Sequence, residues 1–262
     1  MLADSLVVTW RTLKRIPRIP ELALFAILQS IMFVLLFAYV FGGAIDVPGE
    51  GNYREFLMGG IFAQTIVFSA FGVAMALAND RKNQAVDRFR ALPIARGAVL
   101  GGHAIANLFK AMLPIVIMSL CGLVIGWRIH DGLVKALFGY LLLIGFAFAM
   151  VWVGVFLASV VATPEGVQGI AFAALFPVTF MASTFVPTES MPQFVQNVAE
   201  WNPVTTLANS IRELFGNPTT AATPNDPWSI AHPVAYTVIW IVGIIAVCAP
   251  LAVRAYQRSV AK

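Results

Sequence analysis

The densest group of charged residues lies at positions 79–98, NDRKNQAVDRFRALPIARGA, between two apolar stretches. Read as a helix, this segment gathers its apolar residues on one face: Ala85, Val86, Phe89 and Leu92. Asp87 can pair with Arg90 on the other face, and Pro93 ends the helix because proline lacks a backbone N–H. A short amphipathic helix with an exposed phenylalanine is suited to docking in a groove of another protein. A plain basic loop that only orients the chain is the alternative.

The chain lacks the groups that an ATPase or a metalloenzyme needs. Gly-Lys does not occur, so the sequence contains no phosphate-binding loop of the Walker A type. The three histidines, His103, His130 and His232, are not spaced as metal ligands. We therefore expect no catalytic, cofactor-binding or metal-binding residue in this chain.

Polar and aromatic residues within the apolar stretches are the candidates for contact with a transported molecule. Phenylalanine is abundant, with 20 residues. Such rings are ordinarily explained by contact with lipid. Neutral polar side chains within the spans are ordinarily explained by hydrogen bonding between helices. The sharper interpretation is an aromatic path for an amphipathic molecule. Its candidate residues are Gln64, Phe68, Phe172, Phe176 and Phe180.

The elements that must position these residues are membrane helices. Hydrophobic residues make up 59% of the chain and charged residues 11%, with a mean hydropathy of +0.82. Soluble domains carry about 25% charged residues, so this composition excludes an ordinary soluble enzyme and a disordered protein. The expected fold is all-α, a polytopic membrane protein forming a single domain over residues 1–262. The net charge is +4. In a membrane protein, an excess of basic residues marks the cytoplasmic side, so no binding of nucleic acid is expected.

Apolar stretches set the number of membrane crossings, because a helix needs about 20 apolar residues to span a bilayer. Six transmembrane helices are predicted, at 22–45, 56–79, 99–127, 136–160, 166–187 and 233–253. With the N-terminus inside, twelve Lys and Arg residues fall on the cytoplasmic side and four on the outer side. The positive-inside rule therefore predicts that both termini are cytoplasmic, in a multi-pass protein of the plasma membrane.

Two further segments are amphipathic. Residues 1–20 are expected to form an interfacial helix and not a cleavable signal peptide, because the first apolar run follows four basic residues and is too long. Residues 189–216 are expected to form two short outer helices that lie in the outer membrane surface or dip into it. Asn202-Pro203 breaks this segment, and Gly216 can end its second helix.

Two stretches carry a resemblance to a known family. DRFRALPIARGAVLGG, from Asp87, resembles the daunorubicin- and doxorubicin-resistance (DrrB-like) branch of ABC type-2 transporter permease subunits. NPVTTLANSIRELFG, from Asn202, resembles the second signature of that family. The resemblance implies that 80–93 is a coupling helix, seated in a cleft of a separate ATPase. The residues that it assigns to ATPase coupling are Asp87, Arg88, Phe89, Arg90, Leu92 and Pro93.

The same resemblance implies the partners. An ABC ATPase subunit would hold ATP and magnesium, and this chain would hold neither. A second permease subunit would complete the transporter; a homodimer is favoured and a paralogue is possible. The implied function is ATP-driven export of an amphipathic drug, antibiotic or lipid-like molecule, as in multidrug export and antibiotic resistance. Membrane lipids would surround the subunit.

Two other classes of protein stay open. An ion-gradient-driven carrier or channel would usually keep a carboxylate within the membrane, and no Asp or Glu lies deep in a predicted span. A membrane-embedded lipid-modifying enzyme would need a polar cluster at the membrane surface. The outer segment offers four charged candidates without a histidine at a recognisable spacing: Glu189, Glu200, Arg212 and Glu213.

Overall fold

The computed structural model describes residues 31–32, 34–41, 45, 47, 52–82, 96–161, 163–219 and 226–260. Within these ranges all regular secondary structure is helical, which confirms the predicted all-α class. Three of the described helices are long and apolar enough to cross a membrane. They are α3 (Tyr53–Lys82), α6 (Gly132–Val160) and α11 (Pro233–Val260).

The remaining described elements are shorter or less uniformly apolar. They are η2 (Phe37–Phe41), α5 (Arg96–Ile125), α7 (Pro164–Phe180), η3 (Thr188–Ser190), α8 (Gln193–Glu200), α9 (Pro203–Phe215) and α10 (Trp228–Ala231). Residues 1–20, much of 22–45 and residues 83–93 lie outside the described residues. The interfacial helix, the coupling helix and the six-span topology therefore stay predictions.

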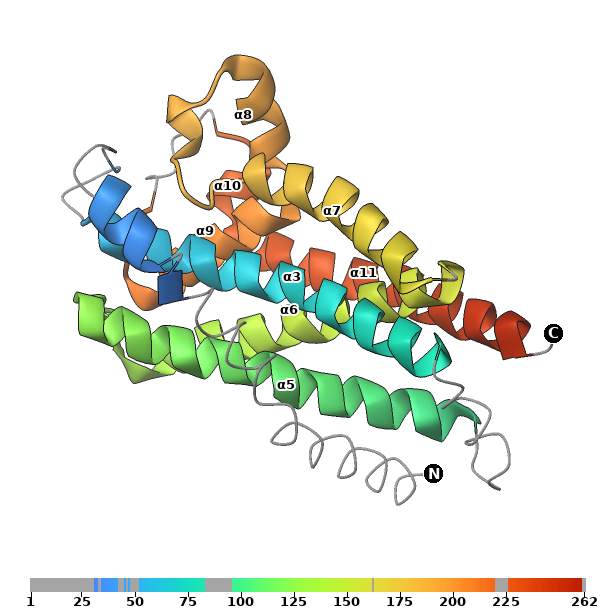
Figure 1. Ribbon diagram of the computed structural model, residues 1–262. Coiled ribbons are helices and arrows are strands. Elements are labelled where there is room, and N and C mark those ends of the chain that lie inside the picture. The colour runs from blue at the N-terminus through green and yellow to red at the C-terminus, as the bar shows by residue number, and fades with distance from the viewer. Residues whose placement is uncertain are drawn as a thin grey trace.

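Helices α3 and α6 pack along each other at the centre of the molecule. Helices α5 and α7 flank α3 on opposite sides, and α11 packs against α6 (Figure 1). Small residues allow the central pair to approach closely: a Cβ added at Gly154 of α6 would lie 2.5 Å from the carbonyl oxygen of Ala70 of α3. Such contacts are typical of membrane helices, where burial of apolar surface from water cannot drive association.

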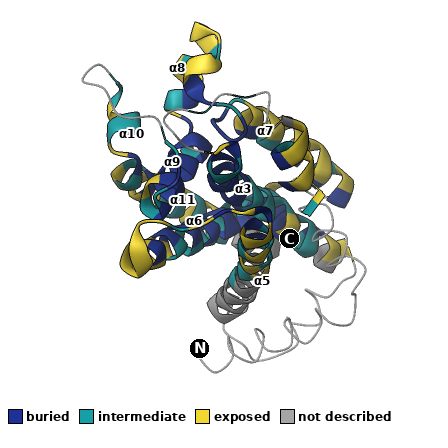
Figure 2. Cartoon of the chain, turned by 90° about the vertical axis from the view of Figure 1, so that its left-hand side faces the viewer, coloured by how far each residue is buried: buried dark blue, intermediate teal, exposed yellow. Residues whose placement is uncertain are grey.

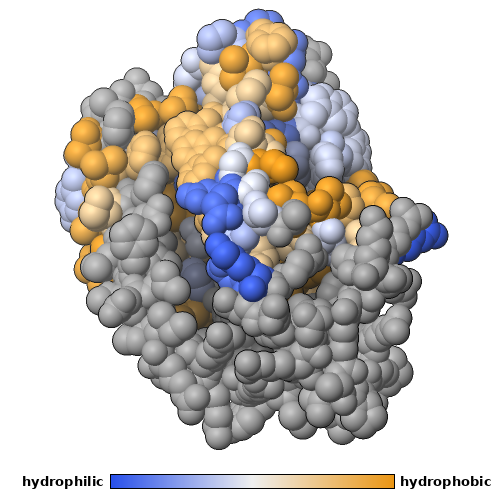
Figure 3. All heavy atoms as spheres, turned by 45° about the vertical axis from the view of Figure 1, so that its right-hand side comes forward, coloured by the Kyte–Doolittle hydropathy of each residue, from blue (hydrophilic) through white to orange (hydrophobic). Residues whose placement is uncertain are grey.

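The outward faces of the long helices are apolar. Leu120 of α5, Leu137 of α6 and Val242 of α11 are each more than half exposed. Figure 3 shows broad hydrophobic areas beside smaller hydrophilic patches on the described part of one face. A surface of this kind is stable against lipid chains and not against water.

Helices α8 and α9 differ from each other more than the sequence suggested. Both were expected in or near the outer membrane surface, but α9 is enclosed by α3, α6 and α11, with Leu207, Ile211 and Phe215 fully buried. Asn202 caps its first turn, and Gly216, at φ 67°, ends it in the left-handed conformation that favours glycine. Helix α8 keeps an exposed apolar face and projects from the bundle (Figure 2).

Helix α7 ends at Phe180, short of the expected end of its span at 187. Residues 181–187 continue as turns and bends, and most of them are buried. Irregular backbone is tolerated at membrane depth only where protein covers it. Here the Tyr53 hydroxyl donates to the carbonyl of Phe185 (3.0 Å), and the backbone N–H of Ser183 donates to the hydroxyl of Thr205 (2.9 Å). We call residues 181–187 the α7–η3 loop.

The close approach of α3 to this loop yields a stability prediction. A Cβ added at Gly60 would lie 1.9 Å from the carbonyl oxygen of Thr184, a backbone atom that cannot move aside freely. We expect Gly60→Ala to destabilise the protein by about 1–3 kcal/mol, measured by unfolding in detergent micelles. Gly72→Ala, in the same helix, is the control because its added Cβ meets nothing within 4 Å. Equal stability of the two variants would contradict this packing.

Candidate functional site

Four of the five predicted path residues meet along one side of the molecule. The ring of Phe68 on α3 contacts that of Phe176 on α7 edge to face, with centroids 5.7 Å apart. Phe176 lies between Phe172 (5.2 Å) and Phe180 (5.4 Å) on its own helix. Phe71, which was not among the candidates, joins α3 to Phe172 at 5.8 Å. We call these five phenylalanines the α3–α7 aromatic face.

The aromatic face is open on one side. Phe172, Phe176 and Phe180 are 43%, 39% and 55% exposed. Gln64 lies one helical turn before Phe68 on α3 and is half-buried, but no ring contact joins it to the face. Rings arranged in this way can stack against a flat or amphipathic molecule. They can equally face lipid chains or a second subunit.

One end of the aromatic face, beyond Phe180, is formed by the α7–η3 loop. Phe185 of this loop stacks on Phe37 of η2, with centroids 4.1 Å apart and planes at 12°. The same ring lies 6.2 Å from Phe180. The position of the loop therefore sets where the row of rings ends.

Arg212 of α9 is the buried charge that holds this loop. Its side chain is completely enclosed. Nε donates to the Phe56 carbonyl (2.8 Å), and one terminal nitrogen donates to the Ser183 hydroxyl (2.9 Å) and the Asn209 side chain (2.8 Å). The other terminal nitrogen donates to the carbonyls of Ser183 (2.7 Å) and Thr184 (3.4 Å). A guanidinium has five N–H groups, and each of them has an acceptor here.

Two further features favour a cation at this position. The guanidinium carbon lies 3.5 Å from the centroid of the Phe56 ring, a cation–π geometry. Arg212 also lies in the last turn of α9, where the helix dipole favours positive charge. Burial lowers the pKa of Arg212 to about 9, and the group is therefore still charged at neutral pH.

Sequence reasoning missed the role of Arg212, because it counted this residue among the outer basic residues. The available signal was its position in the helix. Arg212 follows Ala208 by four residues and precedes Phe215 by three, so it shares a face with both. An arginine on the apolar face of a short helix is expected to be buried and fully hydrogen-bonded.

The same contacts count against the lipid-modifying alternative. Arg212 has no carboxylate among its described partners, and its donors are occupied. Glu189 and Glu213 are exposed, and Glu200 accepts a hydrogen bond from Gln196 on its own helix. The four charged candidates of the outer segment therefore do not form one polar cluster around Arg212.

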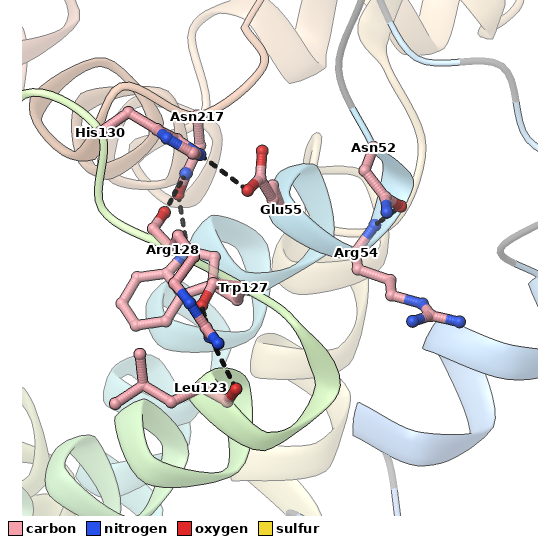
Figure 4. Close-up of polar contacts among 8 residues, drawn as sticks. All are labelled: Asn52, Arg54, Glu55, Leu123, Trp127, Arg128, His130 and Asn217. Atoms are coloured by element: carbon pink, nitrogen blue, oxygen red, sulfur yellow. Dashed lines mark hydrogen bonds and ion pairs between the residues drawn. The ribbon is translucent and has the colours of Figure 1, made fainter.

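A second polar group joins the start of α3, the turn between α5 and α6, and the end of α9 (Figure 4). His130, after α5, contacts Glu55 in the first turn of α3 (2.8 Å). Asn217, after α9, accepts from the buried Trp127 indole (2.7 Å) and donates to the carbonyl of Arg128 (2.8 Å). These contacts hold the turn between α5 and α6 against α3 and the end of α9. Their role is therefore structural.

The predicted coupling residues Asp87, Arg88, Phe89, Arg90, Leu92 and Pro93 lie outside the described residues. The two helices that border them, α3 and α5, end and begin at the same end of the bundle (Figure 1). Lys82, the last residue of α3, pairs there with Glu165 in the first turn of α7 (3.3 Å). A backbone hydrogen bond within α7 and the contact with Lys82 lower the pKa of Glu165. This exposed pair links the end of α3 to the start of α7.

These features define an all-helical membrane protein, and comparison with known proteins identifies its family. Residues 4–215 match the sequence model of the ABC-2 type transporter family. The chain belongs to this family, and the resemblance seen in its two signature stretches is confirmed. It is a membrane permease subunit of an ABC exporter and not an enzyme, with the ATPase on a separate subunit.

The relatives are permeases of the same kind. The chain is 29% identical over 250 residues to the daunorubicin resistance ABC transporter permease protein of Streptomyces coeruleorubidus, covering 95% of this chain and 84% of that protein. It is 26% identical over 263 residues to a probable doxorubicin resistance ABC transporter permease protein of Mycobacterium tuberculosis, covering 98% and 89%. An inner membrane transport permease of Escherichia coli is 18% identical over 191 residues, covering 72% and 73%.

The aromatic face yields a functional prediction. If a transported molecule stacks on it, Phe176→Ala should raise the half-saturating concentration of an aromatic dye about fivefold or more, since one stacked ring contributes about 1 kcal/mol beyond area burial. The measurement is ATP-dependent uptake of rhodamine 6G into inside-out vesicles that contain the permease and its ATPase.

Phe138→Ala is the matched control for this prediction, because Phe138 of α6 is also exposed, at 59%, and is not one of the rings of the aromatic face. Equal effects of the two substitutions would assign the aromatic face to lipid contact.

Proposed function

We propose that this permease exports an amphipathic drug, antibiotic or lipid-like molecule from the cytoplasm. The support is the aromatic face together with the relatives, two of which are named for resistance to daunorubicin and doxorubicin. The cargo enters the path from the cytoplasmic side or the inner leaflet, and the rings bind it by stacking and apolar contact. Recognition of this kind depends on shape and area, which suits a transporter of several related molecules.

The energy for transport comes from a separate ABC ATPase subunit that binds ATP and magnesium. The coupling segment 80–93 docks in a cleft of that subunit through Arg88, Phe89 and their neighbours. One observation carries this proposal: α3 is a continuous helix from Tyr53 to Lys82. A displacement of the coupling segment therefore reaches Phe68 and Phe71, on the same helix, without an intervening hinge. The Lys82–Glu165 pair gives α7 a connection to the same end of α3.

The working transporter contains two permease subunits, and a homodimer is the simplest arrangement. The exposed rings of α7 and the exposed apolar faces of the other helices supply the surface that a second copy and membrane lipids cover. In this proposal the subunit crosses the plasma membrane six times, and both of its termini lie on the cytoplasmic side.

The coupling proposal predicts the effect of two substitutions. Phe89→Ala and Arg88→Ala should each lower ATP-dependent dye uptake about tenfold or more and weaken copurification with the ATPase, because truncating an anchor residue of an interface costs about 2 kcal/mol. The measurements are pull-down of the tagged ATPase and uptake into vesicles.

The control is Phe194→Ala, which removes an exposed phenylalanine from α8. It should leave ATPase binding and uptake unchanged. Intact binding and transport in both coupling variants would refute the assignment of the coupling segment. Uptake that continues without ATP and stops with an ionophore would favour an ion-gradient-driven carrier instead.

A further inference from the structure

Arg212 has no free donor with which to bind a transported molecule. All five guanidinium N–H groups are taken by protein oxygens, and the side chain is completely enclosed. Arg212 can therefore affect transport only indirectly, by fixing the positions of the groups to which it donates.

Those groups belong to three segments. Phe56 is in the first turn of α3, Ser183 and Thr184 are in the α7–η3 loop, and Asn209 is on α9 itself. The loop contributes two backbone carbonyls and one hydroxyl, so the guanidinium satisfies backbone groups that no helix satisfies. Buried carbonyls without such a partner would be costly in the interior of a membrane protein.

Two other residues of α9 hold the same loop. Asn202 donates to the carbonyls of Val178 (2.7 Å) and Met181 (3.3 Å), where α7 ends. Thr205 accepts from the backbone N–H of Ser183 (2.9 Å). Helix α9 thus presents a row of side chains to the end of α7 and to the loop, and Arg212 makes the most contacts of the three.

The held loop carries the last ring of the aromatic row. Phe185 stacks on Phe37 at 4.1 Å and lies 6.2 Å from Phe180. Phe180 in turn stacks on Phe176, with planes at 9°. A shift of Ser183 or Thr184 would be transmitted to Phe185 over one or two peptide units.

We propose that Arg212 is a positioning residue for export: it fixes the α7–η3 loop, and through Phe185 and Phe180 it sets the outer end of the cargo path. The inference rests on the proposed function, because it assigns a cargo path to the aromatic face. Lysine cannot replace arginine in this role. Its ammonium has three donors at a single point, whereas five acceptors surround the planar guanidinium.

A cross-linking experiment tests the hold on the loop directly. Phe37→Cys and Phe185→Cys are introduced together with Cys121→Ala and Cys248→Ala, and a short bifunctional thiol reagent joins the new pair in the membrane. With Arg212 present we expect efficient cross-linking. Arg212→Lys and the gentler Ser183→Ala, which removes only one acceptor, should lower the yield, Arg212→Lys by about fivefold, because a buried hydrogen-bond network loses several partners.

A transport experiment, without the added cysteines, tests the role in export. In inside-out vesicles with the ATPase subunit, Arg212→Lys should raise the half-saturating concentration of rhodamine 6G about fivefold. ATPase binding and maximal ATP hydrolysis should change little, which a general folding defect would not allow. Arg128→Lys is the control, because Arg128 also lies at this end of the bundle but is exposed, and among the described residues its side chain donates to the carbonyls of Leu123 and Trp127 alone.

Three results would contradict, in turn, the hold on the loop, the role of Arg212 in export and the aromatic path. Unchanged cross-linking in both Arg212→Lys and Ser183→Ala would overturn the hold on the loop. Lost cross-linking with an unchanged half-saturating dye concentration would overturn the role in export. A wild-type complex that hydrolyses ATP but moves no dye would refute the proposed aromatic path, while the cross-linking result would still decide what Arg212 holds.

Discussion

The buried guanidinium of Arg212 organises one end of this permease. Removing a charge from water costs several kcal/mol even after the protein relaxes, so Arg212 must be compensated in full. Five protein oxygens and the face of Phe56 supply that compensation. The positions of these oxygens are strictly defined, because a planar guanidinium donates hydrogen bonds only in fixed directions. Three segments far apart in the sequence must therefore meet at one point.

The packing of α3 and α9 fits around the guanidinium of Arg212. Gly59 and Gly60 of α3 leave room for it: a Cβ at Gly59 would lie 2.6 Å from Cγ of Arg212, and one at Gly60 would overlap Thr184. Helix α9 is enclosed because its arginine must reach the carbonyls of α3 and of the α7–η3 loop. Helix α3 is held at this end and runs unbroken to Lys82 at the other. The aromatic face lies between the two ends.

Much of this architecture follows from apolar length and turn chemistry. The long apolar runs predicted helices where α3, α6 and α11 are found, since an apolar stretch in lipid must satisfy its backbone internally. Asn202-Pro203 and Gly216 marked the start and end of α9 correctly, because capping depends on local residues. Phe68 and Phe176, which the sequence grouped as candidates for one path, lie in contact, and their role in transport stays a prediction.

Other features depended on contacts that no local pattern records. The apolar face of α9 was compatible with a membrane surface or a protein interior. Arg212 on that face favours the interior, but its acceptors on α3 and on the α7–η3 loop could not be read from the local sequence. The end of α7 at Phe180 was missed because residues 181–187 are apolar enough to continue a span. Their carbonyls are instead taken by Arg212 and Tyr53, from α9 and α3. Phe185 and Phe37 meet for the same tertiary reason.

The proposed coupling requires that ATP binding on the partner subunit displaces α3, and with it Phe68, so that the aromatic path between Phe68 and Phe176 of α7 changes. The most direct measurement is the distance between spin labels at positions 68 and 176, in the permease–ATPase complex in lipid nanodiscs. We expect ATP, held in the bound state by an inhibitor of hydrolysis, to change this distance, and a proton or sodium gradient across vesicles of the isolated permease to leave it unchanged. An unchanged distance with ATP, or a change driven by the gradient alone, would contradict it.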